Sequence, residues 1–216
     1  MTLPLIESLN IGLPRKELLQ GKEYFTGIVK KSASGPVRLT MNGFEGDGVG
    51  DTKHHGGPDK AVCVYSLEHY QYWERTLGTK LPDAAFGENL TVSGLQEADV
   101  NIGDIFQLGT ALVQVSQPRQ PCNTLAARFG RSDMVKLVVD AGRTGFYMRM
   151  LKEGVVKQGD ALSLVKKDDH AITVAFANSV FHHNRKDSDG IERVLSAPAL
   201  SASWRESFEK LRSQLA

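Results

Sequence analysis

Short apolar runs interrupted by glycine occupy this chain up to about residue 165. The clearest runs are residues 24–29, 37–39, 61–65, 90–92, 105–108, 111–115 and 145–151. Two turn-like sequences, Asn101–Asp104 and Lys157–Asp160, each precede another strand-like run. Many short strands joined by glycine turns are typical of a barrel or closed sheet rather than a parallel α/β fold. The sequence therefore predicts a mainly β domain, a β-barrel with a few helices, over residues 1–165.

Two helices are expected inside this domain. Residues 66–75 have apolar positions at helical spacing, with Ser66 as a plausible N-cap and Gly78 as a stop. Residues 131–139 form the second candidate.

A separate helical region is predicted after Lys166-Lys167-Asp168-Asp169, where the composition changes. The expected N-caps of its three helices are Asp168 or Asp169, then Ser188 or Asp189, then Ser203 with Glu206 as a capping box. In the last helix one apolar face is formed by Trp204, Phe208, Leu211 and Leu215. Since roughly 50 residues of helix are marginal alone, we expect this domain, residues 166–216, to dock onto the barrel or onto a partner chain.

The charge balance and the cysteine content argue against several classes of protein, although a local basic site and a structural disulfide stay open. The 216 residues include 26 basic and 25 acidic side chains, a net charge of +1, which gives no global reason to expect a nucleic acid partner. Two cysteines make neither a disulfide framework nor a four-cysteine zinc site. The start of the chain lacks the features of a signal peptide, and no stretch approaches the roughly 20 apolar residues that span a bilayer. We expect a cytoplasmic protein with reduced thiols and no membrane contact.

The first candidate for chemistry is the segment from Gln117 to Thr124, which reads QPRQPCNT. Its two prolines disfavour both helix and central strand, so the segment should form a fixed loop. Cys122 is the side chain such a loop would present, and Arg119 supplies a cation that favours the thiolate. The alternative is a half-buried cysteine that acts as a small hydrophobic residue. The local sequence leaves both open.

The second candidate is the glycine-rich loop over residues 43–60. Glycine lets backbone amides approach a ligand, and successive amides can bind an anion. Positive charge would come from Lys53, His54, His55 and Lys60. The loop matches no standard nucleotide fingerprint, and a glycine turn with solvated charges is the alternative. Adjacent side chains on a strand point to opposite faces, so one of the two histidines is expected to face a substrate and the other to be structural.

A third candidate is FGENLT, residues 86–91, where Glu88 and Asn89 follow a glycine turn. These side chains could orient a polar ring system or could cap the turn. Cys63 lies in an apolar run, and a structural role is favoured for it.

Together these stretches resemble the MOSC family, named for the C-terminal domain of molybdenum cofactor sulfurases. The matching pieces are GDGVGDTKHHGGPDKAV, FGENLT, QPRQPCNTL, GFYMRML and a closing V-x-x-GD, which cover about residues 20 to 165. The helical region is similar to the three-α-helix domain found behind MOSC in the YiiM-type subgroup. That subgroup is associated with resistance to 6-N-hydroxylaminopurine.

The resemblance implies a β-barrel fold and a pterin-based molybdenum cofactor (molybdopterin), with Cys122 as the molybdenum ligand. It makes Arg119, Lys53 and the glycine-loop amides, including those of Gly56 and Gly57, partners for the cofactor's phosphate. It also suggests that Asn89 and Asn123, with Thr124 beside them, contact the pterin. The family further carries an association with pyridoxal phosphate binding.

The resemblance implies an oxidoreductase that acts in detoxification. It would reduce N-hydroxylated base analogues to an amine and water. His54 or His55 could relay the protons near neutral pH. The chain has no iron–sulfur pattern and no flavin fingerprint, so a separate reductase is expected to supply electrons. The helical region could cover the site, form a homodimer or receive the electron donor.

Two other functions compete with this one. Sulfur transfer through a persulfide on Cys122 needs the same reactive thiol, so the sequence does not separate it from reduction. A non-enzymatic binding module is the other, because three short helices can imitate a helix-turn-helix. The basic residues of the helical region alternate with acidic ones, however, as on an ordinary solvated surface.

Overall fold

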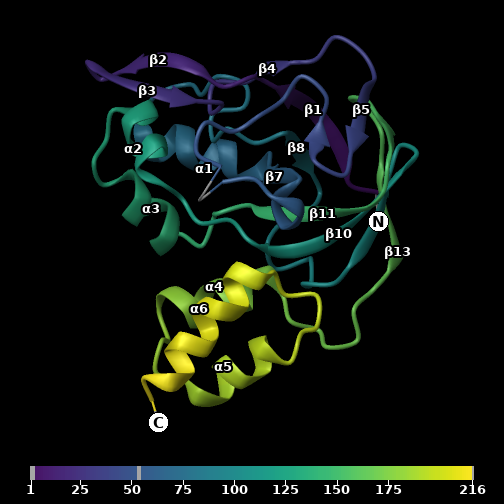
Figure 1. Ribbon diagram of the computed structural model, residues 1–216. Coiled ribbons are helices and arrows are strands. Elements are labelled where there is room, and N and C mark those ends of the chain that lie inside the picture. Colours follow the sequence, from purple (N-terminus) through teal and green to yellow (C-terminus); the bar gives the residue numbers. More distant parts are fainter. Residues whose placement is uncertain (1–2, 53–54, 216) are drawn as a thin grey trace.

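A curled eight-stranded sheet forms the body of the protein in the computed structural model, which describes residues 3–52 and 55–215 (Figure 1). The order of its strands is β13 (Leu162–Lys166), β9 (Ile105–Leu108), β10 (Ala111–Pro118), β11 (Phe146–Lys152), β7 (Val62–Ser66), β8 (Leu90–Ser93), β1 (Leu5–Ile11) and β4 (Lys31–Ser32). Neighbours are antiparallel except β7 and β8, which are parallel. The expected barrel-type β fold is confirmed in the form of a half-barrel.

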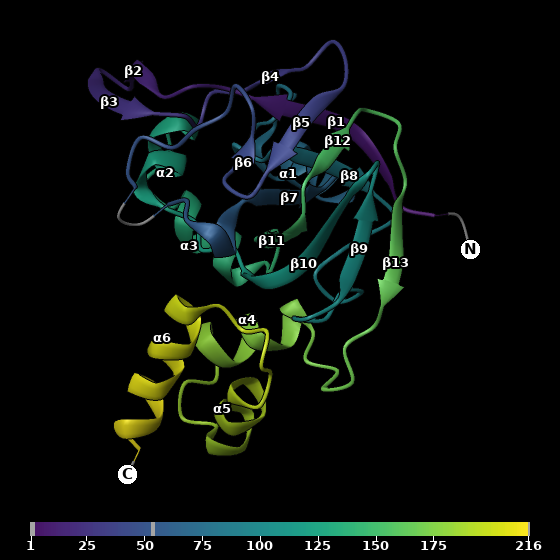
Figure 2. The ribbon, with the colours of Figure 1, turned by 45° about the vertical axis from the view of Figure 1, so that its right-hand side comes forward.

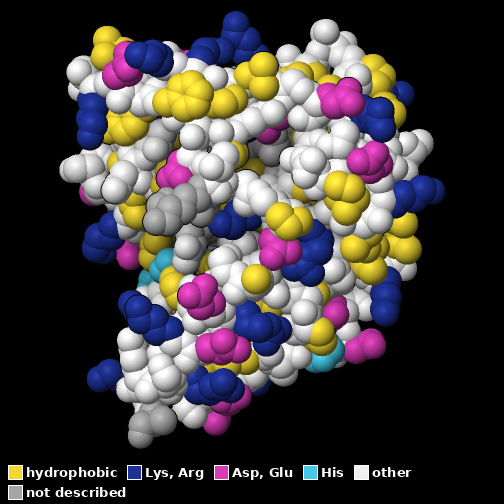
Figure 3. All heavy atoms as spheres, in the orientation of Figure 1, with side chains coloured by type: hydrophobic (Ala, Val, Ile, Leu, Met, Phe, Trp, Pro, Cys, Tyr) yellow, Lys and Arg dark blue, Asp and Glu magenta, His cyan; other side chains and the backbone are white. Residues whose placement is uncertain are grey.

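Two smaller sheets complete the β-rich part. One contains β12 (Gly154–Val156), β5 (Val37–Thr40) and β6 (Gly43–Phe44), and the other is the hairpin of β2 (Arg15–Leu19) and β3 (Lys22–Thr26). The hairpin turns through Gln20 and Gly21, whose φ angles of 50° and 77° suit a tight two-residue turn. Leu18 and Phe25 stay 75% and 61% exposed on it. Hydrophobic side chains accordingly gather over this hairpin in Figure 3.

Three short helices and one 3₁₀ turn cover one end of the sheet among the described residues. They are η1 (Pro58–Lys60), α1 (Glu68–Leu77), α2 (Asn123–Phe129) and α3 (Met134–Asp140). Helix α1 ends at Gly78 as predicted, in a left-handed conformation. The predicted cap is wrong, because Ser66 is the last residue of β7 and its hydroxyl donates to Glu68. Helix α2 begins directly after Cys122, where the sequence predicted only a loop.

The helical region contains α4 (Val174–His182), α5 (Ser188–Leu195) and α6 (Ala202–Ser213), so the three predicted helices are confirmed. Their N-caps are corrected by one or more residues. The side chains of Thr173, Asp187 and Ser201 accept the capping hydrogen bonds, at 3.0, 2.9 and 3.3 Å. Asp168 instead accepts from the backbone N–H of His170 and holds a turn.

The helices dock onto the sheet, as expected. Figures 1 and 2 show them as a layer beneath the strands, and their buried side chains belong to the same hydrophobic core as those of the sheet. Trp204, Phe208 and Leu211 are at most 3% exposed, whereas Leu215 is 41% exposed. Backbone hydrogen bonds also join the layers, from Ile102 N–H to the carbonyl of Ile172 for example. A domain boundary between residues 165 and 166 stays a prediction.

Across the described residues, every helix is too short or too polar to cross a membrane.

Candidate functional site

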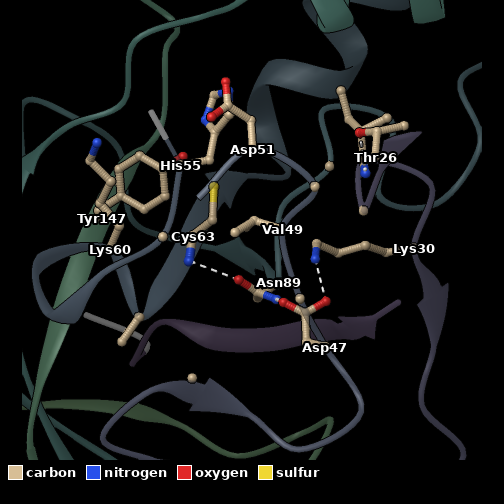
Figure 4. A pocket seen from close by; sticks show the side chains of 18 of the residues that line it. Thr26, Lys30, Asp47, Val49, Asp51, His55, Lys60, Cys63, Asn89 and Tyr147 are labelled. Carbon is tan, nitrogen blue, oxygen red and sulfur yellow. Dashed lines mark hydrogen bonds and ion pairs between the residues drawn. The ribbon is translucent and has the colours of Figure 1, made fainter. Parts of the chain in front are cut away.

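A cavity of 240 Å³ lies between the glycine-rich loop and the start of α2. Figure 4 shows side chains that line it. Its wall is built by segments that are distant in sequence. The polar and thiol side chains that line it are Thr26, Lys30, Asn42, Asp47, Asp51, His55, Lys60, Cys63, Asn89, Arg119, Cys122, Thr124 and Tyr147. The cavity therefore combines three of the candidate stretches named from the sequence.

The glycine-rich loop is pressed against the end of β3. A Cβ built on Gly50 would lie 2.0 Å from the carbonyl oxygen of Phe25, and one on Gly27 would lie 2.1 Å from that of Gly48. These glycines are required because two backbones approach closely. Gly57 differs, since its φ is 87° and a Cβ there would meet nothing within 4 Å. Anion binding by this loop stays a prediction, and Gly57 is the glycine with space beside it.

Cys122 occupies the N-cap position of α2, with an extended backbone at φ −123° and ψ 168°. Its carbonyl accepts from the N–H of Leu125 at 3.0 Å, which fixes the start of the helix. Burial alone would raise the pKa of the thiol. The hydrogen bond with His55 and the charge of Arg119 outweigh burial and lower the pKa of Cys122 to about 6. At neutral pH the favoured form is the thiolate, which is both a nucleophile and a soft metal ligand.

Arg119 is a buried cation behind this thiol. It is 6% exposed, and its guanidinium donates to the carbonyl of Phe86 at 2.5 Å. Burial works to lower the pKa of Arg119, but Cys63, Tyr147 and Cys122 raise it above the usual value. Arg119 therefore stays charged. The charge of Arg119 interacts with the thiols of Cys63 and Cys122. Its contact with a phosphate stays a prediction.

Asn89 is hydrogen-bonded to the protein on both sides of its amide. Its Nδ2 donates to Asp47 Oδ2 at 2.7 Å and to the carbonyl of Asn10 at 3.3 Å, while its Oδ1 accepts from the N–H of Cys63 at 3.0 Å. Asp47 is also paired with Lys30. Asn89 thus ties β8 to β1, β7 and the glycine-rich loop. Its expected contact with a pterin stays a prediction, and both of its amide hydrogens are already used.

Glu88 holds the turn before β8. It is fully buried, and it accepts from Phe86 N–H at 3.1 Å, from Thr91 Oγ1 at 3.0 Å and from the hydroxyl of Tyr70. Of the two roles left open by the sequence, turn capping is therefore the one that the structure supports for Glu88.

The structure brings most of the predicted site residues into one cavity. Those that line it are His55, Gly56, Gly57, Asn89, Arg119, Cys122 and Thr124. Lys53 and His54 lie outside the described residues. Asn123 is exposed as the first residue of α2, and it is not among the residues that line the cavity. Its expected contact with the pterin is therefore not supported by its position.

The sequence did not point to Lys30 or Tyr147, and the structural role favoured for Cys63 stays a prediction, although its side chain also lines the cavity. Cys63 pairs with Tyr147 across β7 and β11. Burial raises the pKa of Cys63, and burial also raises the pKa of Tyr147, with Cys63 adding to that effect. Tyr147 lies in GFYMRML, so the motif itself was a signal. Lys30 stands beside Lys31 in an unremarkable basic pair, and nothing local marks it as buried.

The described residues include no group of three or more His, Cys, Asp or Glu side chains arranged to hold a metal ion. Cys122 would be a single protein ligand, which suits a metal that carries sulfur ligands of its own.

Comparison with known families accounts for both parts of the chain. Residues 51–163 match the MOSC domain, and residues 172–214 match the YiiM-like, 3-alpha helix domain. The chain is 52% identical over 208 residues to the uncharacterized protein YflK of Bacillus subtilis, which covers 96% of this chain and 94% of that protein. It is 38% identical over 152 residues to a protein of Gibberella moniliformis named reductase, covering 68% of this chain and 27% of that protein.

The fold is shared with a solved structure as well. The crystal structure of YiiM from Geobacillus stearothermophilus superposes with a TM-score of 0.83 at 41% sequence identity. The match covers 97% of this chain and 99% of that one. The half-barrel and the three-helix layer are therefore found together in that protein too.

Proposed function

The chain belongs to the MOSC family and carries the three-helix unit of its YiiM-like members, and from this premise we propose that it is a molybdenum-cofactor-dependent reductase of N-hydroxylated compounds. The observation that carries the proposal is Cys122, a thiol with its pKa lowered to about 6 on the wall of a 240 Å³ cavity. A soft thiolate that lines a cavity suits a metal that already carries the sulfur ligands of a pterin.

The residues of the cavity fit a pterin cofactor with an attached phosphate. Arg119 and Lys60 contribute positive charge to the wall. Gly57 leaves open space beside backbone amides that could approach an anion. We infer that Cys122 would hold the metal, and that Lys60, Arg119 and the Gly56–Gly57 amides would face the phosphate.

The cofactor would supply two-electron redox chemistry, and the protein would position it. For an N-hydroxylated substrate the balance is R–NHOH plus two electrons and two protons, giving R–NH₂ and water. His55 is the histidine among the described residues of the cavity wall, and it contacts Cys122. Its place beside the metal ligand suits it to deliver a proton to the leaving oxygen. The electrons would come from a separate donor.

A relative named reductase supports redox chemistry for this chain, at 38% identity over 152 residues. The chain matches only 27% of that protein, so the substrates and partners of the whole reductase do not transfer with the name.

The test is a viologen-driven assay with 6-N-hydroxylaminopurine on protein produced in a host that makes the cofactor. We expect stoichiometric molybdenum and adenine formation in the wild type, and loss of both in Cys122→Ser. The Cys63→Ser variant removes the other thiol of the cavity and should keep its molybdenum. A labile sulfur on Cys122 in protein without molybdenum would overturn the proposal in favour of sulfur transfer.

A further inference from the structure

The first turn of α6 is hydrogen-bonded to two segments that lead into the cavity. The backbone N–H of Ala202 donates to Asp59 Oδ2 at 3.1 Å. The backbone N–H of Ser201 donates to the carbonyl of Ser116 at 3.0 Å. Asp59 belongs to η1 and Ser116 to β10. The helical region therefore contacts both segments within two consecutive residues.

Asp59 and Ser116 are also hydrogen-bonded to each other, so η1, β10 and the start of α6 are joined in one hydrogen-bond network. Ser116 Oγ donates to the carbonyl of Asp59 at 2.5 Å. The remaining carboxylate oxygen of Asp59 accepts from Arg149 Nε of β11 at 2.8 Å. Asp59 is half-buried, and both of its carboxylate oxygens are used in holding neighbouring segments.

The segment that contains Asp59 also contains His55, and the segment that contains Ser116 leads to Cys122. From Asp59 the chain runs back through Gly57 and Gly56 to His55. From Ser116 it runs forward through the end of β10 to Arg119 and Cys122. Asp59 lies four residues after His55, and Ser116 lies six residues before Cys122. A shift of η1 relative to β10 would move His55 relative to Cys122.

We propose that the first turn of α6 is a positioning element of the site, and that Asp59 is the positioning residue through which it acts. Asp59 holds η1 against β10 and so sets His55 against Cys122. This gives the three-helix region a part in the geometry of the cavity. The inference goes beyond the proposed reaction, because reduction and sulfur transfer would both depend on the same alignment.

A single substitution can remove the hydrogen bond from Ala202 to Asp59 and leave the rest of α6 unchanged. Ala202 is the first residue of α6, where proline is well tolerated, and proline has no N–H to donate. Ser201 has φ −57° and ψ 151°, an extended conformation that suits the residue before a proline. Ala202→Pro therefore deletes the bond to Asp59 while the helix remains. Ala202→Ser keeps the N–H and is the matched control.

Hydrogen exchange of the full chain, as purified without cofactor, measures the result. The amides to follow are those of His55 and Lys60, which donate to the carbonyls of Asp51 and Gly57 at 2.9 Å each. Losing one hydrogen bond worth about 1 kcal/mol should speed their exchange about fivefold in Ala202→Pro. Ala202→Ser should stay close to the wild type. Unchanged exchange at His55 and Lys60, with faster exchange confined to α6, would overturn the proposal.

A second variant is needed in case Ala202→Pro disturbs α6 beyond its first turn. Asp59→Ala removes the same contact from the other side, together with the hydrogen bond from Arg149, and leaves α6 intact. In the double variant the loop amides should exchange no faster than in Asp59→Ala alone, since the bond that Ala202→Pro deletes is already absent from Asp59→Ala. Additive effects would contradict the assignment. None of these readouts involves molybdenum, so the result does not depend on the proposed function.

Discussion

His55 contacts the thiol of Cys122 in the cavity, although one residue belongs to the glycine-rich loop and the other is the N-cap of α2. The contact does more than bring two reactive groups together. Burial of Cys122 works to raise the pKa of its thiol, and the hydrogen bond with His55 is the largest influence that lowers it. The charge state of Cys122 therefore depends on where the loop is held.

Alkylation of the cofactor-free protein should report this pKa. The rate of reaction of Cys122 with iodoacetamide should rise with pH through about 6 and level off above it, because the thiolate is the reacting form. In His55→Ala the midpoint should move upward, toward that of an ordinary thiol. Cys63 should stay unreactive in the folded protein, since burial raises its pKa. The Cys63→Ser variant isolates the signal of Cys122, and a midpoint above pH 8 in it would contradict the assignment.

The sequence predicted those parts of the fold and the site that depend on local patterns. The glycine-broken strands, the three helices and the fixed presentation of Cys122 all follow from residues that are close together in the chain. The helix caps were placed wrongly because several residues near each start are suitable caps. Tertiary contacts decide among them. The carbonyl of Ile172 accepts from the N–H of Ile102 in the turn before β9, and α4 is capped by Thr173 and not by Asp168.

Contacts that depend on long-range pairing could not be found in this way. Tyr147 faces Cys63 only because β11 pairs with β7. Lys30 is buried only because Asp47 reaches it from the glycine-rich loop. Asn123 shows the reverse case, since it stands next to Cys122 in sequence but is exposed where α2 begins.

The Lys30–Asp47 pair should be costly to break from one side. The side chains of Lys30 and Asp47 are 5% and 13% exposed, and Asp47 also accepts from the N–H of Gly12 at 2.9 Å. Lys30→Met leaves a buried carboxylate without its cation, which should lower the free energy of unfolding by about 3 kcal/mol. Urea denaturation measures the loss. Adding Asp47→Asn should recover part of it, and a double variant that is less stable by the sum of both losses would argue against the pair.

The close approach of the glycine-rich loop to β3 should make Gly50 intolerant of a side chain. In Gly50→Ala the new Cβ would lie 2.0 Å from the carbonyl oxygen of Phe25, a backbone atom that cannot rotate away. Separating the two segments should cost about 1–3 kcal/mol and should loosen the wall of the cavity. Gly35→Ala is the control, because a Cβ there meets nothing within 4 Å. Thermal unfolding of the two variants, measured side by side, should differ clearly, and equal melting temperatures would refute the packing argument.

The helical region should unfold together with the sheet, because the two share one hydrophobic core. Phe208 is fully buried on α6, and Phe208→Ala should cost about 3–5 kcal/mol by leaving a cavity. Leu215 follows the same helix and is 41% exposed, so Leu215→Ala should change stability by less than about 0.5 kcal/mol.

Circular dichroism and intrinsic fluorescence should report one coincident transition in each protein. Trp73 lies on α1 and packs in a cluster with Tyr65 of β7, whereas Trp204 lies on α6. Replacing one of the two tryptophans by phenylalanine leaves the other as the fluorescent reporter of its own region. If α6 melts well before the sheet in the wild type, the two parts are energetically independent, and α6 could not hold η1 against β10.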